Sequence, residues 1–110
     1  MNQEDKHEEP IAVIRELWQE YFNAPFPNWL RGKDINGIDF VMLDADIAGC
    51  VKTFIERDTL NLSQVAMLGL CYRRVSYVLP ALYEEGAIYF WRLELMAELV
   101  LKEIVKQPPQ

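Results

Sequence analysis

Apolar residues recur at the spacing of an α-helix over most of the chain. In residues 11–22 they fall at intervals of three and four, which gives a helix one apolar side and one polar side. This stripe consists of Ile11, Ile14, Leu17, Trp18, Tyr21 and Phe22. Three further stripes follow, one ending near Arg57, one starting after Asn61 and one over residues 87–105, and none of the segments alternates as a strand does. The pattern predicts an all-α fold, a single-domain antiparallel bundle of about four helices.

The ends of this domain are marked by composition. We expect residues 1–9 to form an acidic, frayed tail, residues 10–106 a single helical domain, and residues 107–110 a short second tail. Pro10 suits the first turn of a helix. The connection over residues 23–39 is unusually long for a compact domain. It holds Phe26, Trp29, Leu30 and Ile35, so we expect it to lie on the bundle and bury these side chains rather than move as a lid.

The third stripe carries recognisable end signals. Asn61 is suited to cap a helix and Gln64 to reach back to it, with Leu60 and Val65 in position to form a hydrophobic staple. Pro80 lacks an amide donor, so it must end or kink this helix.

Composition and charge exclude several classes of protein. The chain has 110 residues, 51% of them hydrophobic, and a net charge of −6, half of which comes from the first ten residues. Nucleic-acid binding needs a basic face, and the largest basic cluster is Arg73-Arg74, so we expect no nucleic-acid partner. No apolar run approaches the about 20 residues of a membrane span, and the N-terminus does not resemble a secretory signal. We therefore expect a soluble cytoplasmic protein without a membrane partner.

Few residues are suited to catalysis. The one histidine, His7, lies in the acidic tail, and the common nucleophile, phosphate-loop, dinucleotide and zinc-protease motifs are absent from the sequence. Cys50 and Cys71 are expected to be reduced core residues. The sequence thus predicts no cofactor, no metal and no catalytic residue, although it leaves the question of enzymatic activity open.

Asp44 and Asp46 are the nearest approach to a chemical site. We expect Asp44 to cap the second helix, with Asp46 in its first turn, where negative charge is favoured. If the helix instead reached back to Phe40, Asp44 would lie beside the apolar face and would need an arginine or a functional reason. The alternative is a small-ligand or divalent-metal site, or a hydrolase, using Asp44 with Asp34, Asp39 or Asp46.

The helix over residues 87–105 has a second apolar line opposite its core face. The line consists of Ile88, Trp91, Leu95 and Leu99. A surface helix needs only one apolar stripe, so the second is covered either by the chain itself or by another molecule. These four residues are our first candidate contacts for a protein partner or a homodimer.

A second candidate patch projects from the helix that follows Asn61. It consists of Leu70, Arg73, Arg74 and Tyr77, and arginine and tyrosine are enriched among residues that dominate binding energy. The alternative is that Arg73 and Arg74 pair with acidic residues of the chain itself.

The sequence favours a small, acidic, non-enzymatic protein-interaction module that associates with itself or with a protein partner. One version is a protein of the immunity or antitoxin kind, because an acidic surface suits the masking of a basic enzyme.

Overall fold

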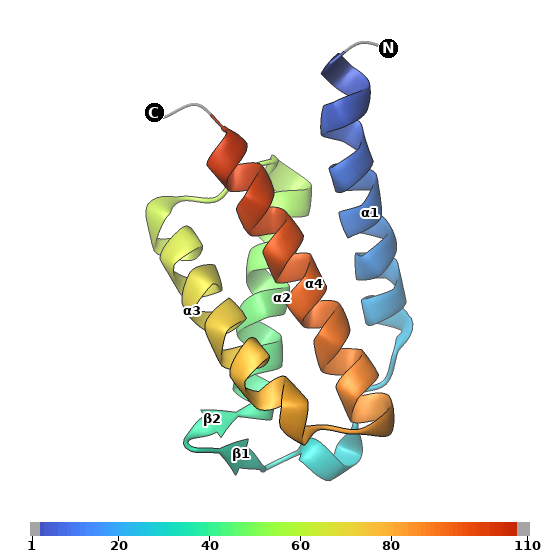
Figure 1. Cartoon of the computed structure of the whole chain (residues 1–110), viewed down its shortest axis with the longest axis vertical. Helices are drawn as coiled ribbons and strands as arrows, with labels where there is room; N and C mark the ends of the chain where they lie inside the picture. Colours follow the sequence, from blue (N-terminus) through green and yellow to red (C-terminus); the bar gives the residue numbers. More distant parts are fainter. Residues whose placement is uncertain (1–2, 108–110) are drawn as a thin grey trace.

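The computed structural model describes residues 3–107, with side chains from residue 9 onward, as four helices in an up-and-down bundle (Figure 1). The prediction of an all-α antiparallel bundle is confirmed. The helices are α1 (Gln3–Asn23), α2 (Phe40–Arg57), α3 (Leu62–Val78) and α4 (Glu84–Lys106). No helix within residues 3–107 is long and apolar enough to cross a membrane.

The fourth helix is the centre of the bundle. It packs against α1, α2 and α3, whereas α1 touches α2 much less than it touches α4. In Figure 1, α4 lies between α3 and α1, so one side of it faces the core and the other faces outward. The fully buried side chains of α4 are Phe90, Leu93, Met96, Ala97 and Val100.

The first helix begins earlier than predicted. It starts at Gln3, so Pro10 lies inside it and not in its first turn, and the segment 3–9 that was expected as a frayed tail is helical. Pro10 has no amide hydrogen, so one carbonyl of the preceding turn lacks its intrahelical donor. Residues 1–2 and the side chain of His7 lie outside the described part of the chain.

The long connection is ordered on the bundle. It contains a 3₁₀ turn, η1 (Asn28–Leu30), in which Leu30 is buried, and Phe26 and Ile35 are partly buried against the core. The expectation that this segment packs is confirmed. Trp29 remains 38% exposed but stacks on Tyr83 of the loop before α4, with ring centroids 4.6 Å apart.

The same connection forms a hairpin that was not predicted from the sequence. Strands β1 (Asp34–Ile35) and β2 (Ile38–Asp39) pair antiparallel across Asn36 and Gly37. Both turn residues have positive φ, 49° and 84°, which is the conformation of an Asn-Gly type I′ turn. The Asn-Gly pair was the available signal, and strands of two residues are too short to show alternation.

The prediction that Asp44 caps α2 is wrong. The cap is Asp39, whose carboxylate accepts a 2.9 Å hydrogen bond from the amide of Met42. The helix therefore begins at Phe40, which moves Asp44 into the second turn and Asp46 beyond the first turn. The physical cause lies in tertiary structure: Phe40 is buried in the core as the first residue of α2.

The boundaries of α3 agree with the sequence signals. The side chain of Asn61 accepts from the amide of Gln64, and the side chain of Gln64 accepts from the amide of Asn61, which is a complete capping box. At the other end α3 stops at Val78, and Pro80 lies in a 3₁₀ turn, η2 (Leu79–Ala81). The last helix, α4, starts at Glu84, three residues before the predicted start.

Candidate functional site

The carboxylate of Asp44 is held between two tyrosines from two other helices. The hydroxyl of Tyr21 in α1 donates to Oδ1 at 2.7 Å, and the hydroxyl of Tyr89 in α4 donates to Oδ2 at 3.0 Å. Both oxygens of this half-buried group thus have a donor, and the single carboxylate joins α1, α2 and α4. The sequence analysis expected an arginine, or a functional reason, for an Asp44 beside the apolar face, whereas its partners are two phenols.

Aromatic rings surround this contact. Phe26 of the long connection lies edge-on to Tyr89 at 5.5 Å, and Trp18 lies 5.2 Å from Tyr21. The guanidinium of Arg31 lies 4.9 Å from the centre of the Phe26 ring, so a positive charge borders the cluster without an ion pair to Asp44. Aromatic side chains thus pack around the two hydrogen bonds of Asp44.

Burial controls the protonation of these groups. It raises the pKa of Asp44 above the usual 3.8, although the hydrogen bonds from Tyr21 and Tyr89 and the charge of Arg31 act in the opposite direction. Burial also raises the pKa of Tyr21 and of Tyr89 far above 10, so both phenols remain protonated and keep donating. The arrangement is suited to holding helices together.

The other aspartates of the alternative site are used elsewhere. Asp34 accepts a 2.9 Å hydrogen bond from the amide of Gly37 in the hairpin turn, and Asp39 caps α2. Asp46 lines a shallow pocket beside Arg74 of α3. Within the part of the chain that the structure describes, no three histidine, cysteine, aspartate or glutamate side chains are grouped as metal ligands.

Both cysteines are free and buried, as expected. The thiol of Cys50 lies 3.7 Å from the carbonyl oxygen of Gln64, and burial raises its pKa. Burial likewise raises the pKa of Cys71 to about 11. Neither thiol has the lowered pKa of a reactive cysteine.

The second apolar line of α4 is only partly covered by the chain itself. Leu95 and Leu99 are partly buried against the core, whereas Ile88 is 56% exposed and Trp91 is 49% exposed. Arg92 borders this line on the side of α1, where its Nε lies 3.5 Å from the carboxylate of Glu20. That distance is within ion-pair range, but Nε makes no directed hydrogen bond. We call the four apolar residues Ile88, Trp91, Leu95 and Leu99 the α4 outer face.

The second candidate patch lies elsewhere on the molecule. The hydroxyl of Tyr77 accepts a hydrogen bond from Asn36, and Arg74 lines a pocket with hairpin residues, so this side of α3 faces the hairpin. The side of α3 that faces α4 carries Ser76, which donates to Glu94 at 2.7 Å. The structure therefore places Arg74 and Tyr77 beside the hairpin and not beside the α4 outer face, while of the other two members Leu70 is half-buried and Arg73 exposed.

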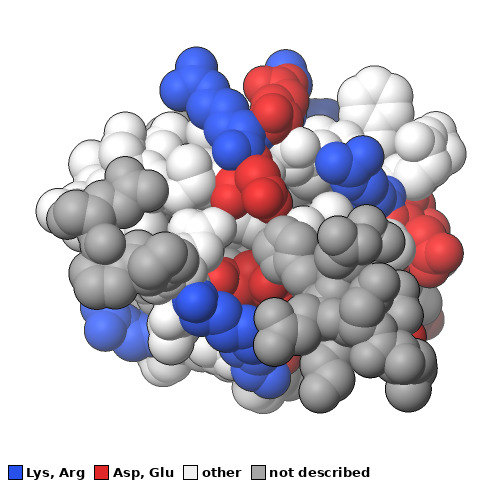
Figure 2. All heavy atoms as spheres, turned by 90° about the horizontal axis from the view of Figure 1, so that it is seen from above, with Lys and Arg blue, Asp and Glu red and all other residues white. Residues whose placement is uncertain are grey.

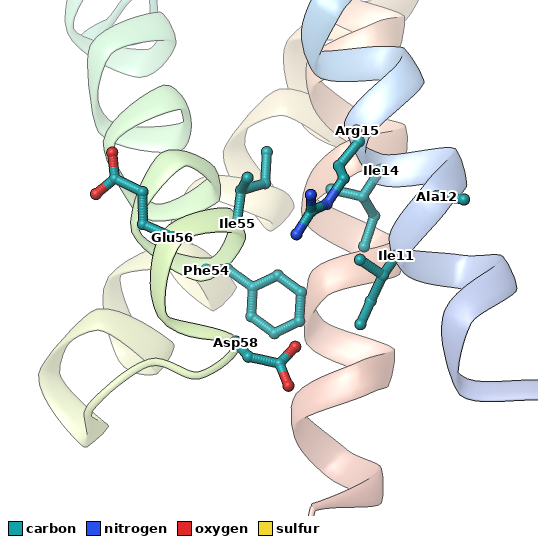
Figure 3. A pocket seen from close by; sticks show the side chains of 8 residues that line it. All are labelled: Ile11, Ala12, Ile14, Arg15, Phe54, Ile55, Glu56 and Asp58. Carbon is teal, nitrogen blue, oxygen red and sulfur yellow. The ribbon is translucent and has the colours of Figure 1, made fainter. Parts of the chain in front are cut away.

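A pocket of about 470 Å³ lies between α1 and the end of α2 (Figure 3). Its walls include Ile11 and Ile14 of α1 and Phe54 of α2, and Arg15 reaches across from α1. The volume suits a small molecule. Arg15 and Asp58 point toward the space between the two helices, whereas Glu56 points away from α1. No residue predicted as a site from the sequence lines this pocket.

Charges are interspersed at the end of the bundle where both termini lie. Figure 2 shows basic and acidic side chains next to one another on the visible described surface. Two such neighbours in α4 are the pairs Lys102–Glu98 at 3.5 Å and Lys106–Glu103 at 3.2 Å. Among the described residues that are visible in Figure 2, charges of one sign do not gather in one place at this end.

No family model, curated protein or solved structure matches this chain. The proposal for its function accordingly rests on its own residues.

Proposed function

We propose that this chain is a non-enzymatic protein-interaction module that docks a partner on the α4 outer face. The observation that carries the proposal is the exposure of Ile88 and Trp91, 56% and 49%, on a helix whose opposite side is fully buried. An exposed apolar strip with polar neighbours is typical of protein-binding surfaces. Tryptophan and arginine are also the residue types that most often dominate binding energy, and Arg92 adjoins Trp91.

The energy available on this face is sufficient for a modest interaction. Fully burying a large apolar side chain contributes about 1.5–3 kcal/mol, so covering the exposed halves of Ile88 and Trp91 contributes about 0.8–1.5 kcal/mol each. Leu95 and Leu99 add the fractions that the chain leaves exposed. Association costs are subtracted from this total, which is consistent with a reversible contact rather than a permanent one.

We place the module in the cytoplasm, because two free buried thiols are usual in proteins of reducing compartments. A partner other than a second copy would be a basic protein, in keeping with the net charge of −6 and the immunity or antitoxin version of the hypothesis.

The alternative function, a ligand-binding or metal-binding bundle or a hydrolase, has less support. Asp34 and Asp39 form local backbone hydrogen bonds, and Asp44 accepts from two phenols. If such a site existed, divalent ions would raise the melting temperature by binding the folded state. We expect no shift with Mg²⁺, Mn²⁺ or Zn²⁺, and a saturable rise that Asp44→Asn abolishes would favour the alternative.

Site-specific photo-crosslinking in the cells that make this protein tests the main proposal. A photoreactive amino acid replaces Trp91 on the α4 outer face or, as a control, the exposed Lys52 on α2. We expect a discrete protein adduct from position 91 that Ile88→Glu removes, and none from position 52. Equal labelling at both positions, or none at either, would contradict the proposal.

A further inference from the structure

The shallow pocket beside Arg74 is formed by three elements of the fold. Its walls are residues 36–39 of the hairpin, Met42, Leu43 and Asp46 of α2, and Arg74 of α3. In Figure 1 the hairpin lies at the end of the bundle where α2 begins and α3 ends, so these walls come from separate parts of the sequence. The volume is about 410 Å³, which suits a small molecule.

Hydrogen bonds hold the walls of this pocket in place. The side-chain amide of Asn36, at the tip of the hairpin, donates to the hydroxyl of Tyr77, which lies one turn after Arg74 in α3. The cap bond from the amide of Met42 to Asp39 fixes the start of α2 against the other end of the hairpin. The hairpin, α2 and α3 are thus joined on both sides of the pocket.

The pocket carries charges of both signs. Asp46 is half-buried and Arg74 is exposed. Burial has the largest effect on the pKa of Cys71, but the charge of Asp46 raises this pKa further and that of Arg74 lowers it, so both charges lie near the same thiol. Among the residues that the structure describes, neither Asp46 nor Arg74 takes part in an ion pair or in a side-chain hydrogen bond. Two opposite charges therefore line one pocket without pairing with each other.

An apolar wall adjoins these charges. Met42 is 59% exposed, and Ile38 is partly buried. Asp39 adds negative charge to this side, although one oxygen of its carboxylate already accepts from the amide of Met42. A matching ligand has a cationic group, an anionic group and a small apolar part.

We propose that this pocket binds a free α-amino acid with an aliphatic side chain. Its ammonium group contacts Asp46, its carboxylate contacts Arg74, and its side chain lies against Ile38 and Met42. A guanidinium and a carboxylate form strong, charge-assisted hydrogen bonds. A ligand with only one of the two charges would cover the other protein group without pairing it, which is unfavourable. This site goes beyond the proposed function, because no residue of the α4 outer face lines it.

Isothermal titration calorimetry on the full chain tests the class of ligand. The probes are L-leucine and two analogues of it: isocaproate, which lacks the ammonium group, and isoamylamine, which lacks the carboxylate. We expect saturable binding of L-leucine and at least ~10-fold weaker binding of each analogue, because each loses one charged contact. Glycine, which keeps both charges but has no apolar side chain, should also bind more weakly.

Two neutralising substitutions test the residues. Asp46→Asn and Arg74→Gln should each weaken the binding of L-leucine at least ~10-fold. Arg73→Gln is the matched control, because Arg73 is the exposed neighbour of Arg74 and does not line the pocket. This variant should bind L-leucine as the wild type does. Circular dichroism of each variant confirms that it is folded.

Three results would overturn the site. They are no saturable binding of L-leucine up to ~10 mM, equal binding of either singly charged analogue, and a loss of binding in Arg73→Gln as large as in Arg74→Gln. The analogues are compared on the wild-type protein, so that comparison does not depend on the folding of any variant. Crosslinking at position 91 reports separately on the proposed function.

Discussion

The hydroxyl of Tyr21 donates a 2.7 Å hydrogen bond to Oδ1 of Asp44, a residue 23 positions away in the sequence. This bond matters because α1 has little contact with α2 and packs mainly on α4. Tyr89 of α4 completes the arrangement by donating to the second oxygen of the same carboxylate. One aspartate thereby links α1 to both α2 and α4.

Removal of this carboxylate should destabilise the bundle substantially. We expect Asp44→Ala to lower the free energy of unfolding by about 2–4 kcal/mol, because two buried phenols lose their acceptor. Urea denaturation followed by circular dichroism measures the change. Glu56→Ala, which removes an exposed carboxylate from the same helix, should change stability by less than about 0.5 kcal/mol. A comparable effect of the two variants would contradict the structural role of Asp44.

The raised pKa of Asp44 predicts a particular dependence on pH. The folded protein holds this proton more tightly than the unfolded chain, whose aspartate titrates near 3.8. The stability linked to this proton is therefore complete below pH 3.8 and is lost as pH rises through the higher folded pKa. Asp44→Asn does not titrate, so the stability of the wild type relative to this variant should decrease as pH rises above 3.8. Urea denaturation of both proteins over that pH range measures this difference in stability. If the difference instead increased with pH, folding would lower the pKa of Asp44 rather than raise it.

Local signals predicted both ends of α3 but not the starts of α1, α2 and α4. Asn61 and Gln64 lie within one turn of each other and form the capping box that their spacing indicates. Asp39 and Asp44, in contrast, are both good caps five residues apart, and local sequence does not choose between them. The choice depends on tertiary contacts, which are the burial of Phe40 in the core and the hydrogen bonds to Asp44 from Tyr21 and from Tyr89, 45 residues away.

The exposure of the α4 outer face could likewise not be predicted from local sequence. Helical spacing places Ile88, Trp91, Leu95 and Leu99 on one line, and the structure has this line on the side of α4 away from the fully buried core face. How much of each side chain stays exposed depends on the packing of α1 and α3 beside α4, which spacing alone does not determine. The result is uneven, with Ile88 and Trp91 exposed and Leu95 and Leu99 partly covered.

Two helical glycines should respond oppositely to alanine. A Cβ atom on Gly86 would lie 2.7 Å from Cζ2 of Trp29, which is already stacked on Tyr83. We expect Gly86→Ala to lower the free energy of unfolding by about 1–2 kcal/mol, because this overlap outweighs the better helix propensity of alanine. Gly49→Ala in α2 meets no atom within 4 Å and should raise it by about 0.5–1 kcal/mol. Thermal and urea unfolding measure both, and two equal gains would show that Trp29 moves aside freely.

Alkaline pH should destabilise the protein through Cys71. Burial raises the pKa of this thiol from 9.0 to about 11, so the unfolded chain loses the proton first. The corresponding stability is present below pH 9 and is lost as pH rises toward 11, by about 1–3 kcal/mol. Urea denaturation over this range should show a decline that is shallower in Cys71→Ala, whatever the stability of that variant near neutrality.

A thiol reagent near pH 8 should modify neither cysteine in the native protein and both in the denatured one. Rapid native labelling of Cys71 would mean that the region around α3 opens far more readily than its burial indicates.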